Sequence, residues 1–140
     1  LALMLPLRHT RLWRVSSLVI LLLVLAATLS PALWFFDSKA KALIWFHNAD
    51  KWLHAGTFVV LTVWFTGLYE RRVWWLTALG LVLFGFLVEF CQLQVSYRTA
   101  DWIDIAANTV GIIIGLIIAA AGLGGWGLRV EDWYSRRHLN

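Results

Sequence analysis

Long apolar stretches limit how this chain can fold more than any other feature of its sequence. A helix needs about 20 residues to cross the hydrocarbon core of a bilayer, and four stretches approach or exceed that length. They lie near 15–36, 52–69, 73–93 and 102–124. Of the 140 residues, 61% are hydrophobic and 14% are charged, whereas soluble domains carry about 25% charged residues. We therefore predict an all-α integral membrane bundle of four transmembrane helices, flanked by tails at 1–14 and 125–140.

The first apolar stretch also has features of a secretory signal peptide. Arg8, Arg11 and Arg14 precede it, and Ser30-Pro31-Ala32 is a tolerable cleavage site. However, its apolar run of about 22 residues exceeds the 7–15 residues that are usual for a signal peptide. We therefore expect an uncleaved span.

The Lys and Arg residues predict the orientation of the four spans. The N-terminal tail, the turn at 70–72 and the C-terminal tail lie on one side, and they hold eight: Arg8, Arg11, Arg14, Arg71, Arg72, Arg129, Arg136 and Arg137. The opposite side holds four: Lys39, Lys41, Lys51 and Arg98. Since positive residues collect in cytoplasmic loops, we expect both termini to be cytoplasmic in a multi-pass membrane protein.

Several classes of function find no support in the sequence. The formal net charge of +4 is scattered, and no basic run exceeds two residues, so a nucleic-acid partner is not expected. Cys91 is the only cysteine, which excludes an intrachain disulfide. The G-x-S-x-G, H-E-x-x-H and P-loop patterns are absent. No cofactor is evident, although a divalent cation stays an alternative.

Polar residues gather where three of the predicted spans meet the outer side. One charge at the centre of a bilayer costs roughly 2.5–3.5 kcal/mol even on the most lenient scale, so such residues need partners or a function. They are Asp50, Lys51 and His54 at the start of the second span, Glu89 and Gln92 at the end of the third, and Arg98, Asp101, Asp104 and Asn108 entering the fourth. We expect them to line one shallow cavity that faces outward.

The polar residues of the fourth span continue into glycines along one helical face. Asp101, Asp104, Asn108, Gly111 and Gly115 follow one another in steps of three, four, three and four, which traces a single stripe on a helix. The Gly-x-x-x-Gly spacing lets membrane helices approach closely. We therefore expect Gly111 and Gly115 to serve helix packing rather than chemistry.

Three polar motifs in this order resemble the VanZ-like family of membrane proteins. They are Asp50-Lys51-x-x-His54, Glu89-x-x-Gln92, and Arg98-x-x-Asp101-x-x-Asp104-x-x-x-Asn108-x-x-Gly111-x-x-x-Gly115. The family is named after a protein associated with teicoplanin resistance, and its biochemical mechanism is not established. The resemblance implies a small multi-span protein of the bacterial cytoplasmic membrane. It also implies that the polar residues of these motifs, except Asp101, form the site that is characteristic of the family. At the position of Asp101 the family varies.

Three functions are compatible with such a site. In the first, Arg98 and Lys51 bind an anionic group of a cell-envelope lipid, of a lipid-linked precursor or of a glycopeptide-like ligand, because arginine suits phosphate. In the second, a membrane enzyme acts on lipid-linked headgroups, with Glu89, Asp101 and Asp104 as cation ligands and His54 as ligand or base. In the third, the charges form a structural network that sets the register of the helices.

A transporter is disfavoured by the position of the polar residues. They stop near Asn108, and the cytoplasmic halves of the four spans contain no ionisable residue, so no polar path crosses the bilayer. The sequence predicts neither the oligomeric state nor the identity of the ligand.

Overall fold

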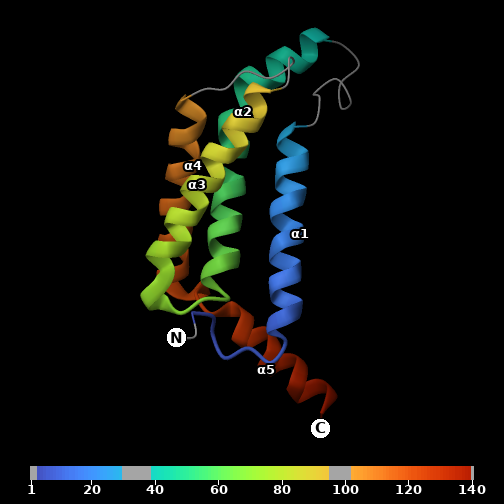
Figure 1. The fold of residues 1–140 in the computed structure, drawn as a ribbon, viewed down its shortest axis with the longest axis vertical. Helices are drawn as coiled ribbons and strands as arrows, with labels where there is room; N and C mark the ends of the chain where they lie inside the picture. Colours follow the sequence, from blue (N-terminus) through green and yellow to red (C-terminus); the bar gives the residue numbers. More distant parts are fainter. Residues whose placement is uncertain (1–2, 30–38, 95–101, 140) are drawn as a thin grey trace.

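The computed structural model of the protein describes residues 3–29, 39–94 and 102–139, with side chains from Lys51 onward in the second range. Four long helices run alternately up and down, and a fifth lies across one end of the bundle (Figure 1). They are α1 (Thr10–Leu29), α2 (Lys39–Thr66), α3 (Trp74–Leu93), α4 (Trp102–Ile118) and α5 (Trp126–His138). The described residues form no β-strand, and one isolated bridge pairs Met4 with Tyr69. The all-α prediction is confirmed for this part of the chain.

Three stretches of helix in the described residues are long and apolar enough to cross a membrane. They are Thr10–Leu29, Arg71–Leu93 and Trp102–Leu123. The expected span at 52–69 is not among them, so the described residues support three of the four predicted spans. Most of that span lies in α2, which runs from Lys39 to Thr66 and carries Lys51 and His54, so the apolar part of the helix is diluted by polar residues.

Two glycines let α4 pack directly against α2. A Cβ atom added at Gly111 would lie 2.2 Å from the backbone oxygen of Ala55, and one added at Gly115 would lie 2.5 Å from Cβ of Thr62. Real carbon atoms do not approach so closely, so the two backbones touch only because these positions lack a side chain. This contact fixes how α2 and α4 are rotated toward each other.

The apolar core lies in the middle of the bundle. Phe58 and Leu61 from α2 contact Leu81 from α3 and Ile112 from α4, and α1 adds partly buried aliphatic residues. Thr62 and Thr66 are buried in α2, but each hydroxyl donates to a carbonyl one turn earlier, at 2.6 Å to Phe58 and 2.8 Å to Thr62. The core therefore buries these hydroxyl groups without leaving them unpaired.

The C-terminal tail is helical, which the sequence did not predict. A π-helical turn at Ala119–Leu123 ends α4, and the chain then turns through Gly122 (φ 152°) and Gly125 (φ 73°) into α5. These positive φ values favour glycine because a Cβ atom would be strained there. Helix α5 thus lies under the bundle, beside the N-terminal segment (Figure 1).

A buried carboxylate joins α5 to the start of α1. Glu131 accepts backbone N–H bonds from Arg8 at 2.6 Å and His9 at 3.0 Å, and an indole N–H bond from Trp13 at 2.8 Å. A negative group is favoured at a helix N-terminus, where N–H groups lack partners within the helix. Burial raises the pKa of Glu131, but these donors outweigh burial and hold the pKa below its ordinary value.

Candidate functional site

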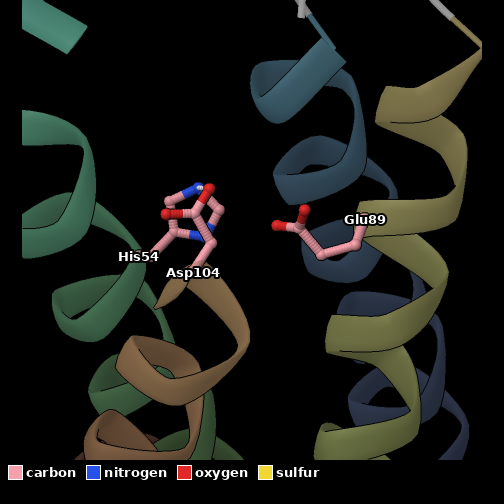
Figure 2. Close-up of side chains that lie close together, drawn as sticks. All are labelled: His54, Glu89 and Asp104. Atoms are coloured by element: carbon pink, nitrogen blue, oxygen red, sulfur yellow. Dashed lines mark ion pairs between the residues drawn. The ribbon is translucent and has the colours of Figure 1, made fainter. Parts of the chain in front are cut away.

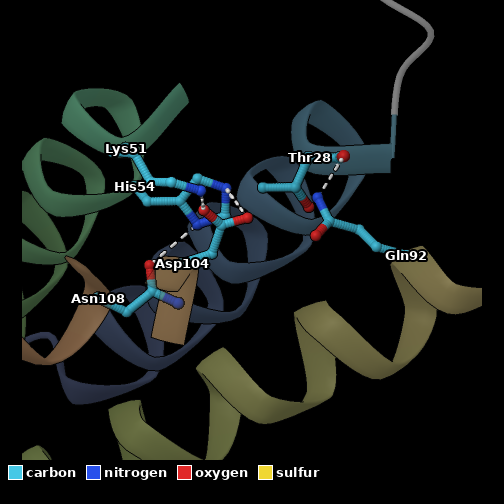
Figure 3. Close-up of polar contacts among 6 residues, drawn as sticks. All are labelled: Thr28, Lys51, His54, Gln92, Asp104 and Asn108. Carbon is cyan, nitrogen blue, oxygen red and sulfur yellow. Dashed lines mark hydrogen bonds and ion pairs between the residues drawn. The ribbon is translucent and has the colours of Figure 1, made fainter. Parts of the chain in front are cut away.

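Polar side chains from three helices meet at the end of the bundle opposite α5. We call this set the polar cluster, and Figure 3 shows most of it together with Thr28 of α1. Lys51 and His54 come from α2, Glu89 and Gln92 from the last turns of α3, and Asp104 and Asn108 from the first turns of α4. All except Lys51 are buried. The polar cluster consists of Lys51, His54, Glu89, Gln92, Asp104 and Asn108.

His54 is oriented by an amide on the neighbouring helix. Its Nδ1 lies 3.0 Å from Oδ1 of Asn108. An amide oxygen carries no hydrogen, so the imidazole is the donor and Nδ1 bears the proton. In the neutral ring Nε2 then carries the lone pair, and it lies 4.0 Å from Oδ2 of Asp104.

Asp104 forms an ion pair with Lys51. Nζ of Lys51 lies 2.5 Å from Oδ1 of Asp104, and the side chains are 38% and 4% exposed, respectively. The partly exposed lysine side chain therefore places its positive charge beside a buried carboxylate. Because a buried charge is costly without a partner, this pair makes the position of Asp104 tolerable.

Glu89 completes a group of three possible metal ligands. Its carboxylate points from α3 toward His54 and Asp104 (Figure 2). One ligand atom from each of the three residues lies within 4.8 Å of the other two, and all three residues are buried. Two carboxylates and an imidazole therefore surround one small volume between three helices.

The amides of Gln92 and Asn108 are only partly satisfied within the described structure. Nε2 of Gln92 donates to the backbone oxygen of Thr28 at 3.1 Å, which ties α3 to α1. Its Oε1 and the Nδ2 of Asn108 are buried, and neither has a hydrogen-bond partner among the described residues. Gly85 leaves room for Asn108, since an added Cβ would lie 3.0 Å from Nδ2.

Three of the predicted site residues cannot be compared with this geometry. Arg98 and Asp101 lie outside the described residues, and so does the side chain of Asp50. Gly111 and Gly115 lie beyond the polar cluster, where α4 touches α2. The other six predicted residues all belong to the polar cluster.

Two exposed tryptophans lie at the same end of the bundle. Trp52 follows Lys51 in α2, and Trp102 begins α4 two residues before Asp104. Both side chains are largely exposed. Indole rings favour the headgroup layer of a membrane, so a residue type typical of that layer adjoins the polar cluster on both α2 and α4.

Comparison with known proteins identifies the family. A family model described as VanZ/LLP1 matches residues 3–123, most of the chain. The chain belongs to the VanZ/LLP1 family. Together with its apolar helices, this membership makes it a multi-pass membrane protein.

The VanZ/LLP1 match is accompanied by a eukaryotic relative. A protein of the fission yeast Schizosaccharomyces pombe, described as "Uncharacterized protein C11E3.10", is 40% identical over 73 residues, which are 49% of this chain. The match covers 45% of that protein, so this VanZ/LLP1 chain spans about half the length of the curated relative it matches. No solved structure matches the chain.

Two contacts had no signal in the sequence. Every residue has a backbone oxygen, so the pattern of side chains could not predict that Gln92 would bind the backbone oxygen of Thr28. Glu131 was not among the residues that the sequence pointed to, although it binds the start of α1. Spacing within one helix cannot reveal either contact, because both join segments far apart in the chain.

Proposed function

We propose that this VanZ/LLP1 protein binds the phosphate-bearing headgroup of a membrane lipid at the polar cluster. The observation that carries the proposal is the partly exposed side chain of Lys51, whose ammonium group pairs with buried Asp104 at the end of the bundle. A phosphate that approaches from the headgroup layer meets this cation first. Arg98, which lies outside the described residues, is proposed as a second anion ligand because its fork donates paired hydrogen bonds.

The proposed membrane arrangement has four spans. In this arrangement α2 crosses the membrane together with α1, α3 and α4, because the apolar half of α2 packs in the same core. The polar cluster then faces the non-cytoplasmic side, and α5 and both termini are cytoplasmic, as the positive residues favour. In a bacterium this is the inner membrane, and the ligand is a cell-envelope lipid, its lipid-linked precursor or a glycopeptide-like molecule.

Among these ligands, a general phosphate headgroup agrees best with the comparisons. A relative in fission yeast does not favour a ligand that is confined to the bacterial envelope. A role in teicoplanin resistance is therefore a narrower hypothesis than headgroup binding. The chemistry common to the lipid candidates is an anionic phosphate on a lipid anchor.

A lipid-retention experiment tests this function. Purified protein in detergent is mixed with phosphatidic acid or with diacylglycerol, which lacks the phosphate, and the lipid that co-elutes in gel filtration is measured. We expect phosphatidic acid to be retained in preference, and Lys51→Ala to reduce its retention about tenfold. Arg72→Ala is the matched control, because Arg72 pairs with Glu70 at the opposite end. Equal retention of the two lipids by the wild type would refute the proposal.

A second candidate is that the polar cluster is a structural network. It is favoured by the bonds that join α2 to α4, from Lys51 to Asp104 and from His54 to Asn108. In that case Glu89→Gln and Asp104→Asn should both lower the melting temperature and leave lipid retention per folded molecule unchanged. Variants that stay as stable as the wild type but lose phosphatidic acid would exclude a purely structural role.

A further inference from the structure

We infer that His54, Glu89 and Asp104 bind one divalent transition-metal ion of the Zn²⁺ or Mn²⁺ type. The three residues come from three helices, and their ligand atoms lie within 4.8 Å of one another. Ligands on a tetrahedral zinc ion are about 2.0–2.2 Å from the metal, which sets them about 3.4 Å apart. To reach that spacing, the ligand atoms need to approach one another by at most about 1.4 Å.

The orientation of His54 is an independent argument for a metal. A histidine that binds a metal through one nitrogen usually donates its other N–H to an oxygen, which fixes the tautomer. Here Asn108 accepts that bond from Nδ1 at 3.0 Å, so the lone pair on Nε2 is directed to the side of Asp104. Asn108 is thus a positioning residue for the proposed ligand.

The charges of the polar cluster also suit a divalent ion. Among its described side chains, ionised Glu89 and Asp104 carry two negative charges, and Lys51 carries one positive charge. The two carboxylates and the imidazole are buried, where the attraction between anionic ligands and a bound cation is strong. The Lys51 side chain is 38% exposed, so it can leave Asp104 for the surface. A divalent ion in its place would make the ligand set neutral.

The type of ligand distinguishes among metals. Imidazole favours Zn²⁺ and other transition metals, whereas Ca²⁺ takes six to eight oxygen ligands. Three protein ligands with one imidazole leave a coordination position open, as in catalytic zinc sites. Gln92 offers an additional buried oxygen, Oε1, three residues after Glu89 on the same face of α3.

Metal binding does not depend on the proposed lipid binding, because it is measured in detergent without added lipid. The protein is purified, treated with a chelator and re-exposed to Zn²⁺, Mn²⁺ or Ca²⁺. Bound metal is then counted by mass spectrometry after desalting, and the melting temperature is recorded. We expect about one Zn²⁺ or Mn²⁺ per chain and a higher melting temperature, with no such response to Ca²⁺. A wild-type protein that takes up no ion overturns the inference.

Substitutions of the proposed ligands test where the ion binds. His54→Gln, Glu89→Gln and Asp104→Asn should each abolish the bound ion, and Asn108→Ala should weaken binding about 10–100-fold, as expected for a residue that orients a ligand. Glu131→Gln is the matched control, since Glu131 is also buried but lies at the other end of the bundle. An ion that survives both Glu89→Gln and Asp104→Asn would overturn this site.

Cys91 requires its own control because thiolates bind zinc. It lies two residues from Glu89 in α3 and is partly exposed. Cys91→Ser should keep the ion at full stoichiometry. If a ligand variant fails to fold, the absorption spectrum of the Co²⁺-loaded wild type decides the question: bands of imidazole and carboxylate ligation support the site, and a thiolate charge-transfer band contradicts it.

Discussion

His54 and Asn108 form a hydrogen bond between two helices that determines which imidazole nitrogen carries the proton. Nδ1 lies 3.0 Å from Oδ1, and both residues are buried. The bond crosses the same α2–α4 contact that Gly111 keeps close. Orientation of the candidate ligand and packing of the helices therefore depend on one interface.

Removal of the Asn108 amide should destabilise the protein. Asn108→Ala leaves the buried N–H of His54 without its acceptor, and such a loss costs about 1–3 kcal/mol. Thermal unfolding in detergent measures the effect. Thr109→Val is the control, because the Thr109 hydroxyl donates only to Ile105 in its own helix. Equal stability of the two variants would show that the interhelical bond contributes nothing.

Addition of a methyl group at Gly111 should separate α2 from α4. The new Cβ of Gly111→Ala would lie 2.2 Å from the backbone oxygen of Ala55. Because this oxygen is part of the backbone, it cannot move aside as the end of a flexible side chain could. Overpacking of this kind costs about 1–3 kcal/mol. Gly56→Ala is the matched control, since nothing lies within 4 Å of its added Cβ. We expect a lower melting temperature for Gly111→Ala alone, and no difference between the two would contradict the packing role.

The Lys51–Asp104 pair should show energetic coupling. Lys51→Met removes a cation from a carboxylate that is 4% exposed, so it should destabilise more in the presence of Asp104 than in an Asp104→Asn background. Neighbouring charged residues typically couple by about 0.5–3 kcal/mol. A double-mutant cycle of unfolding free energies measures this coupling, and strictly additive effects would argue against the pair.

Acid should loosen α5 from α1. The pKa of Glu131 is held below the ordinary glutamate value in the folded protein. Its contribution to stability is therefore present above that ordinary value and is lost as the pH falls through the folded-state pKa. The rate of proteolysis within α5, measured with an acid-active protease, should rise in that window.

Glu131→Gln should remove this pH dependence and make α5 sensitive to protease at neutral pH as well. Asp132→Asn is the control, since Asp132 is exposed on the same helix. A wild-type protein whose α5 resists proteolysis equally across the window would contradict the role of Glu131.

Much of the fold was predictable because membrane helices follow from long apolar runs. The first, third and fourth runs correspond to helices that can cross a bilayer. The second was harder, because polar Lys51 and His54 occupy a helix that begins earlier than the apolar run. Helix α5 was missed since its sequence is polar on most sides and its stability depends on contacts with the N-terminal segment.

The candidate site was predictable as a set of residues but not as a set of contacts. Alternating helix directions bring the end of α3 and the starts of α2 and α4 to one end of the bundle, so Glu89, His54 and Asp104 were expected near one depth. The actual partners were left open. Lys51 was expected to bind an anionic ligand group, and in the structure it pairs with Asp104.

The sequence alone determined the helical class, the family and the end of the bundle where the polar residues collect, because these depend on apolar length and on helical spacing. Only the tertiary structure decided that Glu89 points toward His54 and Asp104, and that Asn108 orients the imidazole. Helical spacing places a side chain on a face of its own helix, but the rotation of one helix against the next determines what that face meets. Gly111 and Gly115 set that rotation through backbone contact, which exists only when the helices are packed.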